Sequence, residues 1–256
     1  MLDVIFEQVM LFSISIVANG LSALAGGGAG LLQLPALLFL GLVFSTALAT
    51  HKIASVALGV GATLRHMKEK RINMRFAAFV LLSGLPGVVV GAMVILTIPD
   101  AIAKTVLGVF TTGLGVYSWL SPDLGMVRRD RHLSRKGWLI GAIGLFSIGF
   151  LNGSITSGTG LFVTLWLVLW FGLDYQRAVT YTLILVGLFW NGLGALTLAF
   201  QTTVKWEWLP ALILGALAGG YLGAHLSIAK GNKLVKRAFE LVTVAVGCSL
   251  IVHGLL

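Results

Sequence analysis

Long apolar runs follow one another through almost the whole chain, separated only by short polar connections. The run at residues 77–96, AAFVLLSGLPGVVVGAMVIL, is apolar on every helical face. A helix needs about 20 such residues to cross a bilayer. Strands of a membrane barrel would alternate polar and apolar residues, and this pattern is missing. Because lipid cannot hydrogen-bond the backbone, we expect an all-α integral membrane protein with several spans and no soluble domain.

The composition agrees with this expectation and argues against a nucleic-acid partner. Of the 256 residues, 57% are hydrophobic and 11% are charged, and the net charge is +9. The positive charges lie in short loops between apolar segments, where they record membrane orientation rather than nucleic-acid binding. The single cysteine, Cys248, excludes an intrachain disulfide, and we expect it to be a buried small hydrophobic residue.

Ten apolar segments can be separated by their polar or glycine-rich connections. The segments are 5–24, 29–44, 46–64, 74–97, 102–120, 137–156, 159–173, 177–199, 207–229 and 235–255. Segments 29–44 and 159–173 are short for a crossing, and each follows a glycine-rich break. They are therefore either full spans or partial, re-entrant arms.

Lysine and arginine gather in three connections, around residues 65–75, 128–136 and 230–237. The positive-inside rule places all three in the cytoplasm. Even numbers of segments separate these loops, so one orientation satisfies all of them. We expect a multi-pass protein of the inner (cytoplasmic) membrane with both termini outside. His66 lies in the first loop and is expected to be solvated.

The two halves of the sequence resemble each other. Three pairs of stretches match: NGLSALAGGGAG at 19–30 with NGSITSGTG at 152–160, ALAT at 47–50 with AVTY at 178–181, and SGLPGVVVGA at 83–92 with GALAGGYLGA at 215–224. Each half holds five segments, so the second copy would enter the membrane in the opposite sense, as in many secondary transporters. We expect two inverted-topology repeats, 1–120 and 137–256, joined by a basic cytoplasmic linker at 121–136.

Glycine clusters interrupt apolar helices at matching places in the two copies, at Gly26–Gly30 and at Ser157–Gly160. Small residues can simply let helices approach closely, and this is all we expect of Gly87, Gly91 and the glycines at 215, 219 and 223. Paired helix breaks, in contrast, often mark a transporter's substrate site. A broken helix also offers free N–H groups and a positive dipole end, which suit an anion.

Polar residues inside the apolar segments are the candidate ligands. Asn19 and Asn152 precede the two breaks and either line the site or bond between helices. A buried Lys52 would be costly in hydrocarbon, so it either attracts an anion or extends towards the interface. His51 either carries a proton, which makes it the proton-coupling candidate, or only packs. The candidate substrate-binding residues are Asn19, Gly27, Gly28, Thr50, His51, Lys52, Asn152, Thr156, Gly158, Thr159, Thr182 and Asn191.

Catalytic and metal-binding patterns are missing from the sequence. Away from the first turn of each segment, Glu240 is the only carboxylate inside a predicted segment, and we expect it to pair with the neighbouring Lys236 and Arg237. A sodium or calcium site would need more carboxylate oxygens. No Ser/His/Asp arrangement or HExxH motif occurs. We therefore expect neither an enzyme nor a cofactor or metal site.

Several of these motifs together resemble the sulfite exporter TauE/SafE family, also called the four-toluene sulfonate uptake permease family. The matching stretches are AGGGAG at 25–30, ATHKIAS at 49–55, RHMKEKRINMRFA at 65–77, SGLPGVVVGA at 83–92 and NGSITSGTG at 152–160. The resemblance covers nearly the whole chain. His51 stands where an asparagine is usual, and Ser157–Gly160 replaces a more glycine-rich string. The resemblance implies transport of small sulfur-containing anions such as sulfite or organosulfonates, and it favours export.

The sequence thus predicts a secondary transporter that moves a small sulfur-containing anion by alternating access between two inverted repeats. Two alternatives stay open: a passive anion channel, and a non-transporting membrane assembly subunit whose repeats serve only packing. The expected partners are a small anionic substrate and the lipid bilayer, and self-association into a homo-oligomer is left open.

Overall fold

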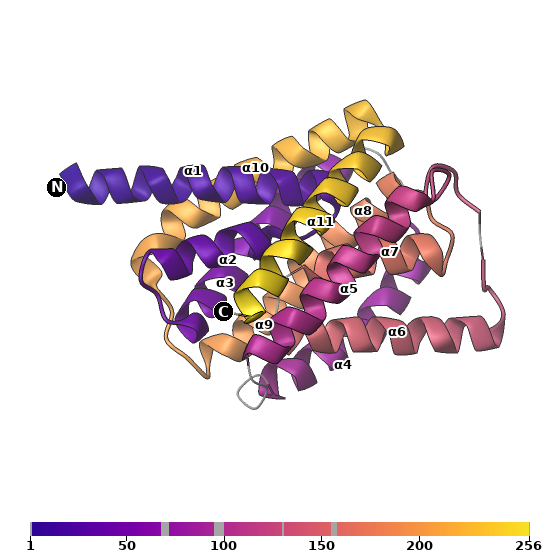
Figure 1. Cartoon of the computed structure of the whole chain (residues 1–256), viewed down its shortest axis with the longest axis horizontal. Coiled ribbons are helices and arrows are strands. Elements are labelled where there is room, and N and C mark those ends of the chain that lie inside the picture. The colour runs from indigo at the N-terminus through magenta and orange to yellow at the C-terminus, as the bar shows by residue number, and fades with distance from the viewer. Residues whose placement is uncertain (1, 68–71, 95–99, 130, 155–157, 256) are drawn as a thin grey trace.

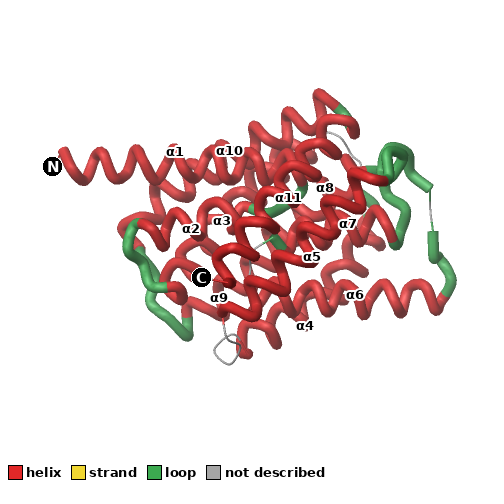
Figure 2. The backbone as a smooth tube through the Cα atoms, viewed as in Figure 1, coloured by secondary structure: helices red, strands yellow, loops and turns green. Residues whose placement is uncertain are grey.

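The computed structural model describes residues 2–67, 72–94, 100–129, 131–154 and 158–255. Every regular element in these parts of the chain is a helix (Figure 2). The first half holds α1 (Leu2–Ala25), α2 (Ala29–Phe39), α3 (Phe44–His66), α4 (Met74–Val94) and α5 (Asp100–Leu120). The second half holds α6 (Arg135–Ser154), α7 (Thr159–Leu169), α8 (Tyr175–Tyr181), the π-helix η3 (Thr182–Trp190), α9 (Asn191–Ala199), the 3₁₀ turn η4 (Trp206–Trp208), α10 (Leu209–Lys230) and α11 (Asn232–Leu255). Each of the ten predicted segments therefore contains a helix, and the all-α membrane class is confirmed.

Six stretches of the described chain are long and apolar enough to cross a membrane. They are Ile5–Ala25, Phe44–His66, Met74–Val94, Arg135–Ser154, Tyr175–Ala199 and Trp206–Lys230. Large apolar side chains also lie on the outer surface, for example Leu82 (75% exposed) and Leu139 (63% exposed). Such a surface suits lipid, whereas a soluble monomer rarely exposes large apolar patches.

The two short segments are half-length helices. Helices α2 and α7 have 11 residues each, about 16 Å, against a hydrocarbon core of about 30 Å. Their predicted ends at residues 44 and 173 were wrong, since the helices stop at Phe39 and Leu169. In both places the chain then turns at a glycine with positive φ, Gly41 (92°) and Gly172 (73°). A helix cannot continue through that conformation, however apolar the following residues are.

The main helix pairs join the two halves of the chain. Helix α1 packs along α10, α4 packs along α6, and α5 packs along α11 (Figure 1). A Cβ added to Gly219 would lie 2.5 Å from Ile16 O, and one added to Gly91 would lie 2.8 Å from Phe150 C. These contacts confirm that the glycines of α4 and α10 serve close packing.

An uninterrupted π-helix, η3, occupies the middle of the predicted segment 177–199 and runs for nine residues. It crosses α3 at backbone contact, because a Cβ on Gly59 would lie 2.5 Å from Gly187 C. π-Helical turns are rare and are frequent at functional sites. Here the π-helix and α3 together form the centre of the molecule.

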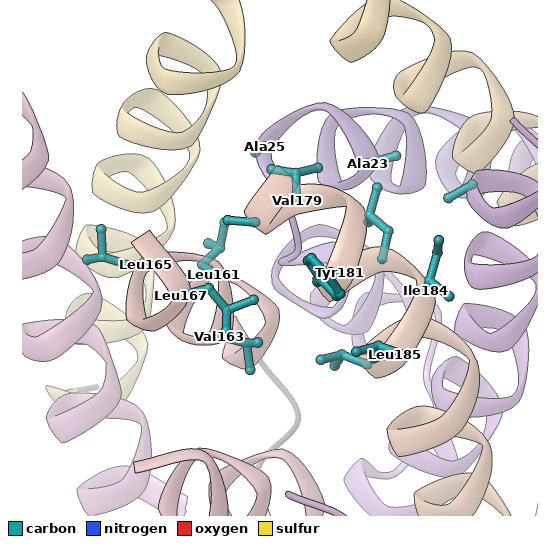
Figure 3. Close-up of a cluster of buried hydrophobic side chains, with 14 of the residues drawn as sticks. Ala23, Ala25, Leu161, Val163, Leu165, Leu167, Val179, Tyr181, Ile184 and Leu185 are labelled. Carbon is teal, nitrogen blue, oxygen red and sulfur yellow. The ribbon is translucent and has the colours of Figure 1, made fainter. Parts of the chain in front are cut away.

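Both half-length helices are packed into hydrophobic cores. Figure 3 shows Leu161, Val163 and Leu165 of α7 in one cluster with Val179 of α8 and Ile184 of η3. Helix α2 contributes to a second cluster with α1, α3 and α10, built on Leu34, Leu37, Leu11, Leu48 and Leu212. The half-length helices are therefore held inside the protein.

Two of the expected environments were wrong. Cys248 is exposed on α11 rather than buried, so the outer face of that helix presents it to the surroundings. His66 is buried rather than solvated, and its Nδ1 lies 3.1 Å from Thr180 Oγ1. Helix α3 continues to His66 and packs there against α8, which removes the side chain from solvent.

Candidate functional site

The two glycine breaks have matching backbone conformations. Gly28 precedes α2 with φ 96°, and Gly158 precedes α7 with φ 77°, both in the left-handed region. Neither residue can cap its helix with a side chain, and neither cap makes a side-chain hydrogen bond. No side chain of the capping residue therefore accepts a hydrogen bond from the first N–H groups of either helix.

The two breaks lie against each other. A Cβ on Gly27 would lie 2.5 Å from Gly160 C, and one on Gly160 would lie 2.9 Å from Gly27 Cα. Only glycine permits this backbone contact, and Gly27 also has a φ of 136°, which other residues rarely adopt. The contact brings the N-termini of α2 and α7, and thus the positive ends of two helix dipoles, to one place.

A cavity of about 40 Å³ lies where these N-termini meet. Its walls come from both breaks, from α3 and from η3 with the first residue of α9. It has room for roughly three water-sized groups, since one needs about 10–15 Å³ by this measure. The lining residues are Ser22, Gly27, Gly28, Ala29, Gly30, His51, Ser55, Leu58, Asn152, Thr159, Gly160, Thr182, Leu183, Val186, Gly187 and Asn191. No carboxylate is among them.

Most of the predicted site residues come together around this cavity. The ones in its wall are Gly27, Gly28, His51, Asn152, Thr159, Thr182 and Asn191. Gly158 caps α7, and Lys52 lies one hydrogen bond behind the wall, through Asn152. Asn19 lies two hydrogen bonds behind it, through Gln33 and His51. Thr50 lies elsewhere, because its Oγ1 accepts the N–H of Lys205 at 3.0 Å. Thr156 lies outside the described residues.

Lys52 organises the second-half side of the cavity. It is fully buried, and its Nζ donates to Asn152 O at 2.8 Å and to Asn152 Oδ1 at 3.1 Å. Because Oδ1 accepts from the lysine, Asn152 Nδ2 points away and donates to Thr159 Oγ1 at 2.9 Å and Asn191 Oδ1 at 3.3 Å. No ion pair among the described residues includes Lys52. The lysine does not extend to the interface.

His51 belongs to a chain of amides on the first-half side. Asn19 Nδ2 donates to Gln33 Oε1 at 3.1 Å, and His51 Nδ1 lies 3.2 Å from the same oxygen. An amide oxygen only accepts, so Nδ1 carries the hydrogen. The other ring nitrogen, Nε2, faces Gly30, where an added Cβ would lie 3.0 Å away. It would accept a hydrogen bond when the ring is neutral and donate one when the ring is protonated.

The hydroxyl groups of Thr164 and Thr182 link the first glycine break to the second half of the chain by hydrogen bonds. Thr164 Oγ1 of α7 donates to Gly26 O at 2.7 Å and lies 2.9 Å from Thr182 Oγ1 of η3. All three residues are tightly packed, because a Cβ on Gly26 would lie 2.6 Å from Thr164 Oγ1. The cavity wall is thus tied together across the two halves.

Sequence reasoning missed several lining residues. Helical spacing would have revealed two of them, since Ser55 lies one turn after His51 and Ser22 lies one turn after Asn19. The apolar lining residues of η3, such as Val186, carry no comparable signal, because nothing in the sequence predicts a π-helix there.

A family model described as "Sulfite exporter TauE/SafE" matches residues 11–250 of the chain. A "Probable membrane transporter protein" of Haemophilus influenzae is 29% identical over 228 residues, covering 89% of this chain and 88% of that protein. "Probable membrane transporter protein ORF9" of Sinorhizobium sp. is 27% identical over 94% of this chain and 91% of its own length. "Probable membrane transporter protein YunE" of Bacillus subtilis is 23% identical over 96% of this chain and 98% of its own length. No solved structure matches the chain.

Proposed function

The chain is a multi-pass membrane transporter of the sulfite exporter TauE/SafE family, and from this premise we propose that it is a secondary transporter of a small sulfur-containing anion. Sulfite and short organosulfonates are the proposed substrates, and export is the favoured direction. The proposed location is the cytoplasmic membrane, with the basic loops inside and both termini outside.

The proposal rests on the meeting of two helix N-termini and a buried lysine at one cavity. Each N-terminus carries about half a positive charge from its helix dipole and directs N–H groups outward from the helix end. Lys52 adds a cation whose Nζ contacts Asn152 in the wall, and none of the described wall residues is a carboxylate. Protein hydroxyls and amides complete the donors, through Thr159, Thr182 and Asn191. Such a surrounding favours an anion over a cation or a neutral molecule.

The volume of the cavity limits the size of the substrate that it can hold. About 40 Å³ accommodates roughly three water-sized groups. Sulfite, with one sulfur and three oxygen atoms, is of this order, whereas an aromatic sulfonate is not. Among the proposed substrates, sulfite and the shortest sulfonates therefore fit this conformation best.

Alternating access is the proposed mechanism, with 1–120 and 137–256 as inverted repeats around the cavity and 121–136 as their linker. The matching αL glycines before α2 and α7 support it, as do the helix pairs α1–α10 and α6–α4, which exchange equivalent elements between the halves. His51 Nε2 is the proposed carrier of a coupled proton, because protonation would turn it into a donor for the anion.

Flux measurements in proteoliposomes test the proposal. The purified protein would be reconstituted, and uptake of labelled sulfite and of short sulfonates would be measured with and without a pH gradient, against protein-free liposomes. We expect saturable uptake of sulfite that unlabelled sulfite inhibits. If none of these anions moves under either condition, the anion proposal fails. Conductance that rises with anion concentration without saturating would instead identify a channel.

A further inference from the structure

A second cavity, of about 340 Å³, lies where α4, α6 and α8 begin. It lies apart from the central cavity and shares no lining residue with it. Its walls combine the first turn of α4, the linker between the two halves, the start of α6 and the connection between α7 and α8. The volume lies within the range of about 300–1,000 Å³ that small-molecule sites occupy.

Three guanidinium groups line this cavity, those of Arg75, Arg128 and Arg177, and none of the described lining residues is a carboxylate. Arg177 is partly neutralised, because its Nε lies 3.3 Å from Asp174 Oδ2. The described lining residues thus include three positively charged side chains. Guanidinium groups present paired N–H donors that match the oxygens of a phosphate, sulfonate or carboxylate.

Part of the cavity wall is aromatic. The ring of Phe76 packs edge-on against Phe171 and Tyr181, each at a centroid distance of 5.1 Å. Trp138 lies 5.6 Å from Phe171, and Tyr181 OH accepts the N–H of Asn73 at 2.7 Å. A wall of this kind binds an apolar body by burial and stacking. An inorganic ion alone would make no use of this apolar surface.

We propose that this cavity is a second anion site, which binds an oxyanion group attached to an apolar body. The arginines would hold the oxyanion, and the aromatic wall would hold the body. Two kinds of molecule share this chemistry: a soluble organic sulfonate, and the phosphate of an acidic phospholipid at the membrane surface. The site does not depend on what the central cavity transports.

The lining residue Trp138 offers a direct readout of occupancy. Benzenesulfonate would be titrated onto the full-length protein in detergent, and the difference in fluorescence between the wild type and Trp138→Phe would isolate the response of this indole. The phospholipid arm would compare lipid nanodiscs of phosphatidylcholine alone with nanodiscs that contain phosphatidylglycerol. The same titration with uncharged benzenesulfonamide would measure how much of the response comes from apolar binding alone.

The double variant Arg75→Gln/Arg128→Gln removes two lining charges. Its matched control, Arg135→Gln/Lys136→Gln, removes two exposed charges at the start of α6 that do not line the cavity. We expect the lining variant to weaken the response at least tenfold and the control to change it less than twofold. The variant Arg75→Lys/Arg128→Lys, which keeps the charge but loses the guanidinium fork, should fall between them. Circular dichroism and size-exclusion chromatography check that the variants are folded.

The two arms identify the occupant. A response to benzenesulfonate in lipid-free detergent would assign the site to a soluble anion, and an arginine-dependent response to phosphatidylglycerol alone would assign it to a lipid phosphate. Equal responses in the lining variant and its control, or no response of Trp138 to either probe, would overturn the proposal. None of these binding measurements depends on transport, so they can fail or succeed independently of the flux measurements that test the proposed function.

Discussion

At the scale of single residues, polar side chains are distributed unequally over the candidate site between the two copies of the proposed repeat. If the match of 47–50 with 178–181 is continued, His51 aligns with Thr182 and Lys52 aligns with Leu183. The cation therefore comes from one copy only. Its hydrogen bonds go to Asn152 of the other copy, so a single lysine fixes an amide across the two halves. Breaking this contact would leave a buried cation unpaired, which is strongly unfavourable.

Replacing Thr159 by valine removes a wall hydroxyl while keeping the size of the side chain. A hydrogen bond to a charged group contributes roughly 1.5–3 kcal/mol, so kcat/KM for the transported anion should fall about 10- to 100-fold. Labelled-sulfite uptake by reconstituted protein measures this. The control is Thr197→Val, whose hydroxyl bonds only to Leu193 O of its own helix and should leave uptake unchanged. Equal effects of both variants would show that the wall hydroxyl does not contact the substrate.

Replacing His51 by glutamine removes the ring nitrogen that faces the cavity and keeps a polar side chain. In the proposed mechanism, an imposed pH gradient accelerates uptake by the wild type. We expect His51→Gln to lose this acceleration, to within about twofold of the rate without a gradient, because glutamine does not titrate. Exchange of labelled for unlabelled anion at equal pH should continue. A variant that keeps the full response to the gradient would exclude His51 as the proton carrier.

Residue types alone predicted much of the candidate site, because a lysine, asparagine or histidine is energetically costly in an apolar segment and therefore indicates a function there. Thr50 shows the limit of this reasoning. Its hydroxyl caps the backbone of Lys205, a partner more than 150 positions away, and no local pattern reveals such a contact. Lining residues of η3 such as Leu183 and Val186 were missed for the opposite reason, since they are apolar.

At the scale of elements, the half-length helices and the π-helix meet at the cavity. The glycine breaks marked the starts of α2 and α7 correctly, because clustered glycines interrupt a helix for a local reason. The ends were predicted too late, since apolar residues continue past Phe39 and Leu169. The π-helix could not be predicted from the sequence of this apolar segment, because an α-helix and a π-helix bury apolar side chains equally well.

Gly27→Ala tests whether the contact between the breaks holds the fold together. The new Cβ would lie 2.5 Å from Gly160 C at a φ of 136°, so clash and backbone strain act together. Strain of this kind costs about 1–3 kcal/mol, and we expect thermal unfolding roughly 5 °C or more below the wild type, with loss of uptake. Gly113→Ala is the control, because nothing lies within 4 Å of its added Cβ. It should stabilise α5 by about 0.5–1 kcal/mol. Similar melting of both variants would mean that the breaks can separate freely.

At the scale of the whole molecule, the two halves are interleaved. An internal repeat could be proposed from the sequence, but the packing partner of each helix could not be predicted. The spacing of glycines in α4 and α10 predicts close helix packing but not the partner helix, because any other apolar segment could pack against them. In the structure, α4 packs against α6 and α10 packs against α1, so each of these helices has its main partner in the other half of the chain. The site lies between the halves for the same reason.

Contacts at the ends of the helices bear on orientation. Gln8 Nε2 of α1 donates to Glu207 O at 3.0 Å, which brings the start of the chain to the connection between α9 and α10. The linker lies at the opposite end of the long axis (Figure 1), where Asn232 Nδ2 donates to Met126 O at 3.0 Å. The connections that carry the positive charge thus gather away from the start of α1, and the positive-inside rule then predicts the start of α1 outside.

Cysteine labelling in whole cells tests this orientation. In a Cys248→Ser background, which removes the exposed native thiol, single cysteines would replace Gln201, in the connection between α9 and α10, or Leu133, in the linker. Both positions are exposed. A membrane-impermeant maleimide should label Gln201→Cys in intact cells and Leu133→Cys only after permeabilisation, because the positive-inside rule places the basic linker in the cytoplasm. The reverse pattern would invert the whole protein, and labelling of both positions in intact cells would mean that the chain inserts in two orientations.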